Sequence, residues 1–327
     1  MTPSGESDLH SVELSKKSAF ATSSCLPFIR NAQNPDGGWG FQPALQSRVE
    51  PTCWAILALR NPANTAAFDE SVTRGLQFLR NAQLADGSWA ASAELRTGCW
   101  VTSVACWVLS GDAEARGAVT AGVKWLCNDW PRDSSLWRRL RARFSSQNRI
   151  SAQNNSYRGW GWTPGTSSWV EPTSFGLILL GRIPAASWPK GAQRRHELAR
   201  KMLYDRMCPG GGWNCGNPMV YGVAGEALII PTVWALLALR DEPNRPEFVM
   251  SLNWLEKNVE NARGTGSLAL ARICMEVNGR RWPAAGAAVT DFCARNESMQ
   301  NVPVAAWTCL ASRDRHEWLT AGSRELC

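Results

Sequence analysis

The sequence is poor in histidine and has no paired cysteines. Its 327 residues include three histidines, and the eleven cysteines are spread singly without one Cys-x-x-Cys pair. This composition argues against a histidine-based metal site or proton relay, and we expect no cofactor. Several cysteines fall within apolar helical patterns, which is typical of small buried residues in a reducing compartment.

Long apolar runs are also missing. No stretch of about 18 apolar residues occurs, and the polar N-terminus lacks the apolar core of a signal peptide. The net charge of +7 is modest, and no nucleic-acid-binding motif accompanies it. We therefore expect a soluble, cytoplasmic protein without a nucleic-acid partner.

Tryptophan is abundant, with 18 residues, and several of them lie in a repeated element. The segment Phe28–Trp39 returns 50 residues later as Phe78–Trp89, each with Asp-Gly before a final Trp and a Gln six residues before that Trp. Degenerate copies of this ending follow at Arg158–Trp162 and Gly210–Trp213. Self-similarity of this kind indicates a repeat architecture.

A short apolar helix is predicted after each copy. These helices align on a threonine with a leucine seven residues later, in the pairs Thr52 and Leu59, Thr102 and Leu109, Thr173 and Leu180, Thr232 and Leu239. Seven residues make two helical turns, so both side chains face the same side. These would be inner helices.

Amphipathic segments alternate with the inner helices and would form outer helices, at Ser71–Gln83, Ala115–Cys127, Arg194–Met207 and Glu247–Glu260. The alternation continues at Gly266–Val277, Ala285–Glu297 and Val302–Ser312. With a first outer helix at about Ser18–Gln33, the pattern predicts six helix pairs. The expected fold is all-α, an (α/α)6 toroid over residues 18–312, between a flexible N-terminal segment (1–17) and a C-terminal tail (313–327).

The Gln-x5-Trp elements resemble the QW motif of squalene–hopene and oxidosqualene cyclases. The predicted ring of helix pairs resembles those enzymes and the β subunits of protein prenyltransferases, over about residues 18–312. In physical terms, each Trp would bury a large ring, and each Gln would satisfy free backbone groups at a helix end. The motif therefore indicates a fold more strongly than a reaction.

The resemblance implies a reaction that begins when an acidic side chain protonates the substrate. Class II terpene cyclases donate a proton from the middle Asp of an Asp-x-Asp-Asp-Thr-Ala motif, which this chain lacks. Glu171 falls at the matching place, and Trp169 and Pro172 replace the flanking acids. Burial would raise the pKa of such a carboxyl and keep it protonated. Without flanking acids, an epoxide or allylic system is a more plausible target than an unactivated alkene.

A structural interpretation of the same residues is open. The sequence around Glu171 recurs at Glu50, and an acid before a proline at the first helical position is an ordinary helix start. Glu50 and Glu171 are thus candidate catalytic acids or helix caps. Aromatic side chains near these helix starts could stabilise a carbocation or simply pack in the core: Trp54, Trp160, Trp162, Trp169, Phe175 and Trp234.

Prenyltransferases instead bind zinc through an Asp-x-Cys pair and a later His. The chain contains Asp291, Cys293 and His316, but the pair lies inside a predicted outer helix and His316 follows the last inner helix. This placement argues against zinc, and no metal is expected.

A basic insertion interrupts the third repeat at about residues 130–150. Trp137, Leu140 and Phe144 share one helical face, and four arginines cover the rest: Arg138, Arg139, Arg141 and Arg143. Such a helix could lie on an anionic membrane or hold a diphosphate, or be a solvated surface helix. Related cyclases dock on membranes, so peripheral membrane association fits the resemblance.

The sequence thus favours a terpene cyclase-like enzyme that cyclises or isomerises an isoprenoid or similar apolar substrate in the central cavity. A single ring has less room than the two domains of squalene cyclases, which favours a sesqui- or diterpenoid. The alternatives are a non-catalytic toroid that binds a lipid, peptide or protein, and a prenyltransferase-like enzyme.

Overall fold

The computed structural model describes residues 21–60, 65–131, 153–262, 264–280, 282, 300–313 and 315–320. Contacts divide the chain into two compact units: residues 1–81 with 262–318 form unit 1, and residues 82–261 with 319–327 form unit 2. The described regular structure is helical apart from one short hairpin, which confirms the all-α fold class.

Unit 1 contains η1 (Ala21–Cys25), α2 (Leu26–Asn31), α3 (Val49–Leu59), α4 (Thr65–Asn81), α12 (Thr265–Val277) and α14 (Val302–Ala311). Helix α3 packs against α4 and α14, and α14 packs against α12. Helices α3 and α14 are buried along almost their whole length, as expected of inner helices. The predicted outer helix at Ala285–Glu297 lies outside the described residues.

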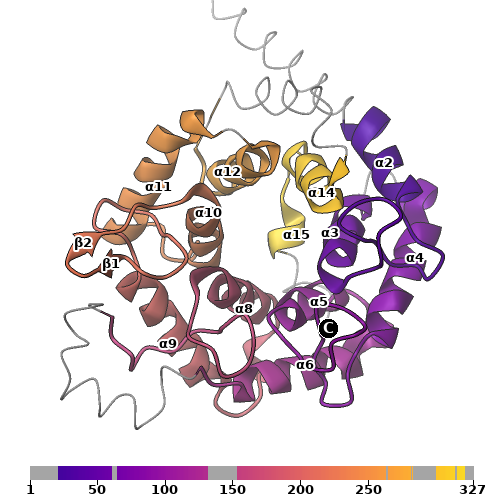
Figure 1. Cartoon of the computed structure of the whole chain (residues 1–327), viewed down its shortest axis with the longest axis horizontal. Helices are drawn as coiled ribbons and strands as arrows, with labels where there is room; N and C mark the ends of the chain where they lie inside the picture. Colours follow the sequence, from indigo (N-terminus) through magenta and orange to yellow (C-terminus); the bar gives the residue numbers. More distant parts are fainter. Residues whose placement is uncertain are drawn as a thin grey trace, which may run out of the picture. The chain divides into compact units, whose positions relative to one another are not determined.

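Unit 2 contains α5 (Val101–Leu109), η2 (Ala113–Ala115), α6 (Arg116–Asn128), α8 (Val170–Arg182), η5 (Ala185–Ser187), α9 (Ala192–Asp205), α10 (Ile229–Ala238), α11 (Pro246–Asn258) and η6 (Val259–Asn261). The buried helices α5, α8 and α10 pack in a row, and α6, α9 and α11 each cover one of them (Figure 1). The hairpin of β1 (Met219–Val220) and β2 (Val223–Ala224) precedes α10.

The border between the two units falls within the short helix α15 (Glu317–Thr320). Trp318 and Leu319 in this helix are buried. In unit 2, the guanidinium of Arg240 donates to the Leu319 carbonyl oxygen at 3.0 Å. The segment that the sequence assigned to a C-terminal tail therefore contributes side chains to the packing.

Each tryptophan loop is fixed to the following helix by one threonine hydroxyl. The Trp backbone N–H donates to Oγ1 of the threonine that aligns the repeats: Trp39 to Thr52, Trp89 to Thr102, and Trp160 to Thr173 at 2.9 Å, and Trp213 to Thr232 at 2.8 Å. The four threonines are fully buried. The recurring threonine is therefore the acceptor for a loop N–H that water cannot reach.

The tryptophan ring fixes the same loop to the preceding helix. The indole N–H of Trp39 donates to the Ile29 carbonyl oxygen at 2.6 Å, and that of Trp213 donates to the Leu203 carbonyl oxygen at 2.6 Å. These carbonyls belong to the last turns of α2 and α9, where the usual partner four residues further along the helix is missing. One residue thus connects the end of a covering helix to the start of the next buried helix.

The expectation that each glutamine satisfies free backbone groups at a helix end was wrong, because its two acceptors are one loop carbonyl and one carbonyl within the next covering helix. Gln33 Nε2 donates to the carbonyl oxygens of Gly37 and Ser71, both at 2.8 Å, and so ties its loop to α4. Gln83 donates in the same way to Gly87 and to Ala118 of α6, both at 2.9 Å. The amide satisfies two carbonyls and links neighbouring repeats.

The two degenerate loops use other side chains for this purpose. In the third loop, the fully buried guanidinium of Arg195 donates to the carbonyl oxygens of Gly159 at 2.7 Å and Asp129 at 2.8 Å. The same guanidinium lies 4.4 Å from the centre of the Trp160 ring, within the range of a cation–π contact. In the fourth loop, Ser251 Oγ accepts the N–H of Gly212 at 2.9 Å.

We expect the Thr102→Val substitution to destabilise the protein because it leaves the buried N–H of Trp89 without its acceptor. The cost should be roughly 1–3 kcal/mol, which corresponds to a loss of several degrees in melting temperature. Thermal unfolding followed by circular dichroism measures it. The matched control is Thr120→Val on α6, an exposed threonine whose hydroxyl bonds only the Arg116 carbonyl oxygen. Equal losses in the two variants would contradict the interpretation.

Candidate active site

Glu171 is the second residue of α8, which begins at Val170. The expectation that a proline occupies the first helical position was wrong, because Pro172 is the third residue of α8 and Pro51 is the third residue of α3. N–H groups throughout the first turn lack partners within the helix, so proline is tolerated at the third position as well. Glu171 therefore belongs to the helix and does not precede it.

The carboxyl group of Glu171 is half-buried and forms no hydrogen bond or ion pair with the described residues. Burial raises its pKa. A capping carboxylate would instead accept a backbone N–H, which lowers the pKa. Glu50 occupies the same position in α3 of unit 1, where it is half-buried and interacts with a neighbouring group.

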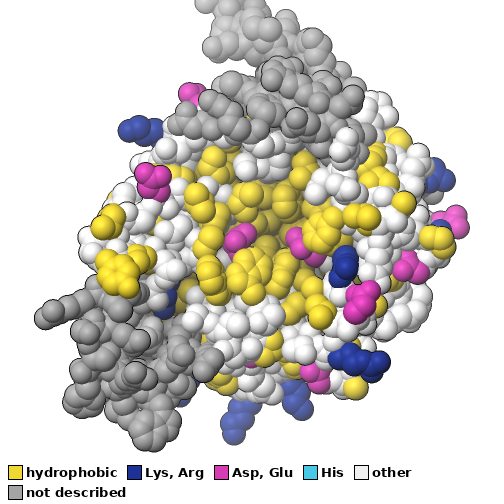
Figure 2. Space-filling view, viewed as in Figure 1, with side chains coloured by type: hydrophobic (Ala, Val, Ile, Leu, Met, Phe, Trp, Pro, Cys, Tyr) yellow, Lys and Arg dark blue, Asp and Glu magenta, His cyan; other side chains and the backbone are white. Residues whose placement is uncertain are grey.

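Four aromatic rings form a contiguous row in unit 2. The rings of Phe175 and Trp234 have centroids 4.8 Å apart, Trp100 stacks on Phe175 at 5.3 Å, and Trp162 meets Trp100 edge to face at 5.2 Å. Phe175 lies four residues after Glu171, and therefore on the same face of α8. Figure 2 shows hydrophobic side chains gathered over α8 and α10. The acid thus stands beside an aromatic wall.

The other predicted aromatic residues have different surroundings. Trp160 is the loop tryptophan that bonds Thr173 and the Leu126 carbonyl oxygen, so its ring serves the fold. Trp169 is half-buried and immediately precedes α8. Trp54 lies in unit 1, fully buried, where it contacts Trp307 edge to face at 5.7 Å.

Sequence reasoning missed Trp100, although a signal was present. Trp100 lies two residues before Thr102, as Glu171 lies two residues before Thr173. The aligned repeats therefore place an aromatic ring at the start of α5 where α8 carries an acid. Because residue 100 is a tryptophan and not an acid, the acidic pattern around Glu50 and Glu171 did not point to it.

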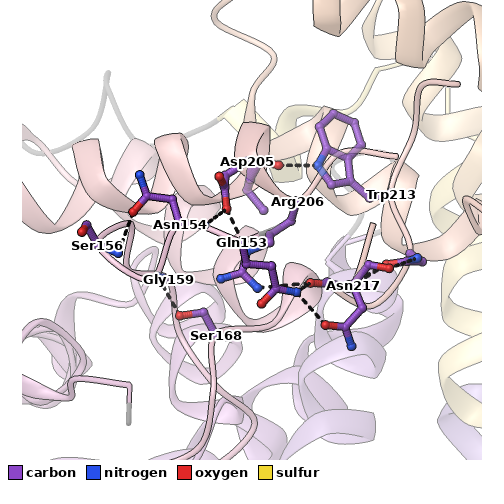
Figure 3. Close-up of polar contacts among 12 residues, drawn as sticks. Gln153, Asn154, Ser156, Gly159, Ser168, Asp205, Arg206, Trp213 and Asn217 are labelled. Carbon is purple, nitrogen blue, oxygen red and sulfur yellow. Dashed lines mark hydrogen bonds and ion pairs between the residues drawn. The ribbon is translucent and has the colours of Figure 1, made fainter. Parts of the chain in front are cut away.

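A polar network holds the loop that follows Trp213 against the end of α9 and against Gln153 (Figure 3). Arg206 is almost fully buried, and its guanidinium donates to Asp205 at 3.1 Å and to the Gly216 carbonyl oxygen at 3.3 Å. Gln153 Nε2 donates to the same Gly216 oxygen at 2.8 Å and to Asn217 Oδ1 at 2.6 Å. Four side chains thus fix the backbone around Gly216.

Within the described residues, no three His, Cys, Asp or Glu side chains come together as a metal-binding group. Asp291 and Cys293 lie outside that part of the chain, and the His316 ring bonds Glu276 at 2.9 Å. No described helix is both long and apolar enough to cross a bilayer. The four arginines of the basic insertion, Arg138, Arg139, Arg141 and Arg143, also lie outside the described residues.

A surface hollow of about 390 Å³ is lined by Gln83–Gly87 and by residues of α6. It contains none of the predicted site residues. The hollow follows from the shape of the second tryptophan loop and is separate from the acid and the aromatic row.

The sequence model of the squalene-hopene cyclase C-terminal domain matches residues 5–102. No curated protein matches the chain significantly. Among solved structures, the type II terpene cyclase MstE from Scytonema without ligand is 16% identical, with a TM-score of 0.55 over 86% of this chain and 79% of that one. A variant of the same enzyme in complex with its substrate, geranylgeranyl dihydroxybenzoate, is 14% identical, with a TM-score of 0.60 over 95% and 99%.

A protein from Actinoplanes is 14% identical, with a TM-score of 0.61 over 90% of this chain and 98% of that one. At these identities the likeness concerns the fold alone. Together with the matching domain model, it confirms the resemblance that the QW-type loops indicated.

We expect Glu171→Gln to stabilise the protein at neutral pH. A raised pKa in the folded state means that folding favours the protonated carboxyl, so this stability is present below the unfolded pKa and is lost as pH rises through the folded pKa. Glutamine avoids the loss, and the melting temperature at pH 7 should rise by about 1–3 °C. The difference should disappear near pH 4. A helix-capping role predicts the opposite sign at pH 7.

The matched control is Glu247→Gln, at the second position of α11. The Glu247 backbone N–H and the Arg245 guanidinium, at 3.1 Å, hold the pKa of this exposed carboxyl below its usual value. Its stabilising effect is present above the unfolded pKa and is lost as pH falls, so glutamine should slightly lower the melting temperature at pH 7. Equal signs for the two substitutions would contradict the assignment of Glu171.

Proposed function

We propose that this chain, which has the all-α fold of the squalene and terpene cyclases, is an acid-initiated cyclase or isomerase of an isoprenoid or similar apolar substrate. The observation that carries the proposal is a half-buried carboxyl with a raised pKa on the helix face that also carries the aromatic ring of Phe175. Among the described residues, Glu171 has no hydrogen-bond or ion-pair partner that would stabilise its charge. A carboxyl whose pKa is raised by burial holds its proton to higher pH and can donate it to a bound substrate.

The aromatic row would stabilise the positive charge that protonation creates. Aromatic faces attract cations, and the interaction is strongest where water is excluded. Phe175 and Trp234 are buried, whereas Trp100 and Trp162 are half-buried and able to meet a ligand. We assign Glu171 as the acid, Glu50 as a second candidate, and the row of four rings as the substrate-contacting wall.

The surroundings of Glu171 also restrict the substrate. Among the described residues, no second acid contacts Glu171. Burial raises its pKa and so makes it a weak acid, which is a poor proton donor for an unactivated alkene. An epoxide or an allylic group, which accepts a proton more readily, fits better. A prenylated aromatic of the kind named for the MstE complex is one class of compound with an apolar isoprenoid tail.

The proposal is tested by identifying the lipid that accompanies the protein purified from cells. We expect mass spectrometry of an organic extract to find a cyclised or isomerised isoprenoid with wild type and its linear precursor with Glu171→Gln. Glu247→Gln is the control and should match wild type. The same lipid in all three preparations, or none, would favour a non-catalytic binding protein and leave Glu171 without a catalytic role.

We expect Trp100→Ala to admit a longer isoprenoid because it removes a ring that covers Phe175. The chain length of the co-purified lipid, measured in the same extraction, should increase or broaden. The control is Trp188→Ala, since Trp188 lies beyond the other end of α8 and bonds the Leu180 carbonyl oxygen. An identical shift in both variants would indicate general loosening and contradict a role for Trp100 in substrate size.

A further inference from the structure

Glu171 requires a neighbour that can accommodate its negative charge once the proton has left. In the proposed function, the carboxylate that remains is half-buried and receives no hydrogen bond from the described residues. An unpaired buried charge is costly and would favour immediate return of the proton. A hydrogen-bond donor near the start of α8 would stabilise this carboxylate.

Cys215 belongs to the loop after Trp213 and lies next to the first residue of α8. Its carbonyl oxygen accepts the N–H of Val170, the residue before Glu171, at 3.2 Å. The adjoining Gly216 is held by Arg206 and Gln153 through its carbonyl oxygen (Figure 3). The backbone of Cys215 is thus held next to the residue that precedes Glu171.

Cys215 is also distinct among the cysteines. Nine cysteines lie in the described part of the chain, all as free thiols, and Cys215 alone of these is not buried. Partial burial raises the pKa of its thiol, and the nearby Glu171 carboxylate raises it further. Asp205 and Arg206, the charged groups of the neighbouring network, are paired with each other at 3.1 Å. The thiol therefore keeps its proton at neutral pH and remains a hydrogen-bond donor, though a weak one.

We infer that Cys215 is a positioning residue for Glu171, whose S–H group donates a hydrogen bond to the carboxylate formed when Glu171 gives up its proton. The inference rests on the proposed function for its catalytic meaning. The thiol keeps its own proton throughout, so the step requires no further acid or base. In this way one thiol supplies part of what the absent flanking acids would supply.

Alkylation by iodoacetamide tests the proximity of Cys215 and Glu171 without any substrate. Only the thiolate reacts, so the pH dependence of the rate reports the thiol pKa, and peptide mass spectrometry assigns the rate to Cys215. In Glu171→Gln the negative charge is gone, and Cys215 should react about twofold faster or more at pH 8. Glu50→Gln, the same substitution at the equivalent position of α3, should leave the rate unchanged.

Equal Cys215 rates in wild type and Glu171→Gln would overturn the inference, as would an equal acceleration in Glu50→Gln. Neither result would affect the comparison of the lipids that accompany wild type and Glu171→Gln. Failure of the inference about Cys215 is therefore distinguishable from failure of the proposed function. Near-ultraviolet circular dichroism verifies that each variant is folded.

Substitutions of Cys215 provide a second test of the inference. Cys215→Ser keeps a short donor, whereas Cys215→Ala removes it. We expect the serine variant to retain most of the wild-type conversion in the lipid extract and the alanine variant to lose at least about half of it. The pH at which conversion is half-maximal should shift only in the alanine variant. Identical conversion and pH profiles for the two variants would overturn the role of the thiol.

Discussion

The bond between a loop tryptophan N–H and a threonine hydroxyl is the contact on which each repeat depends. It satisfies a backbone donor inside the protein, where an unmade bond would cost more than a made bond contributes. The same tryptophan bonds backward through its indole N–H, as Trp39 does to Ile29 and Trp213 to Leu203. In these two loops, the position of the buried helix relative to the preceding covering helix is therefore set by one side chain and one hydroxyl.

This contact also determines where chemistry can vary. The residue two positions before the threonine lies in the first turn of its helix or, for Trp100, immediately before the helix, and its side chain takes no part in the Trp–Thr bonds. That residue is Glu50, Trp100, Glu171 or Ile230 in the four repeats, so an acid, an aromatic ring and an aliphatic chain are all compatible with the same backbone. The fold can thus be kept while the side chains at the helix starts change, which separates fold from function in this family of repeats.

The sequence predicts what depends on neighbours along the chain and misses what depends on neighbours in space. The alternation of helices follows from local periodicity. The acceptors of Gln33 do not, because one of them, the Ser71 carbonyl oxygen, lies 38 residues further along the chain within α4. The role of Arg195 also does not follow from local pattern, because its guanidinium bonds the Gly159 carbonyl oxygen, 36 residues earlier in the chain. In the intact repeats, a glutamine of the loop itself bonds the loop carbonyl. Cys215 is 44 residues beyond Glu171 and belongs to no motif, so only the folded chain brings the two together.

Two other half-buried acids, Glu276 and Glu242, have partners that stabilise their charge. Burial alone would raise the pKa of Glu276, but bonds from His316 and Arg272 outweigh it and lower the pKa. Glu242 is lowered in the same way by Tyr204 and Arg200. Glu171 has no such partner among the described residues, and burial therefore raises its pKa where partners lower those of Glu276 and Glu242. The proposed role of Glu171 as an acid rests on this difference and on its place beside Phe175 on α8.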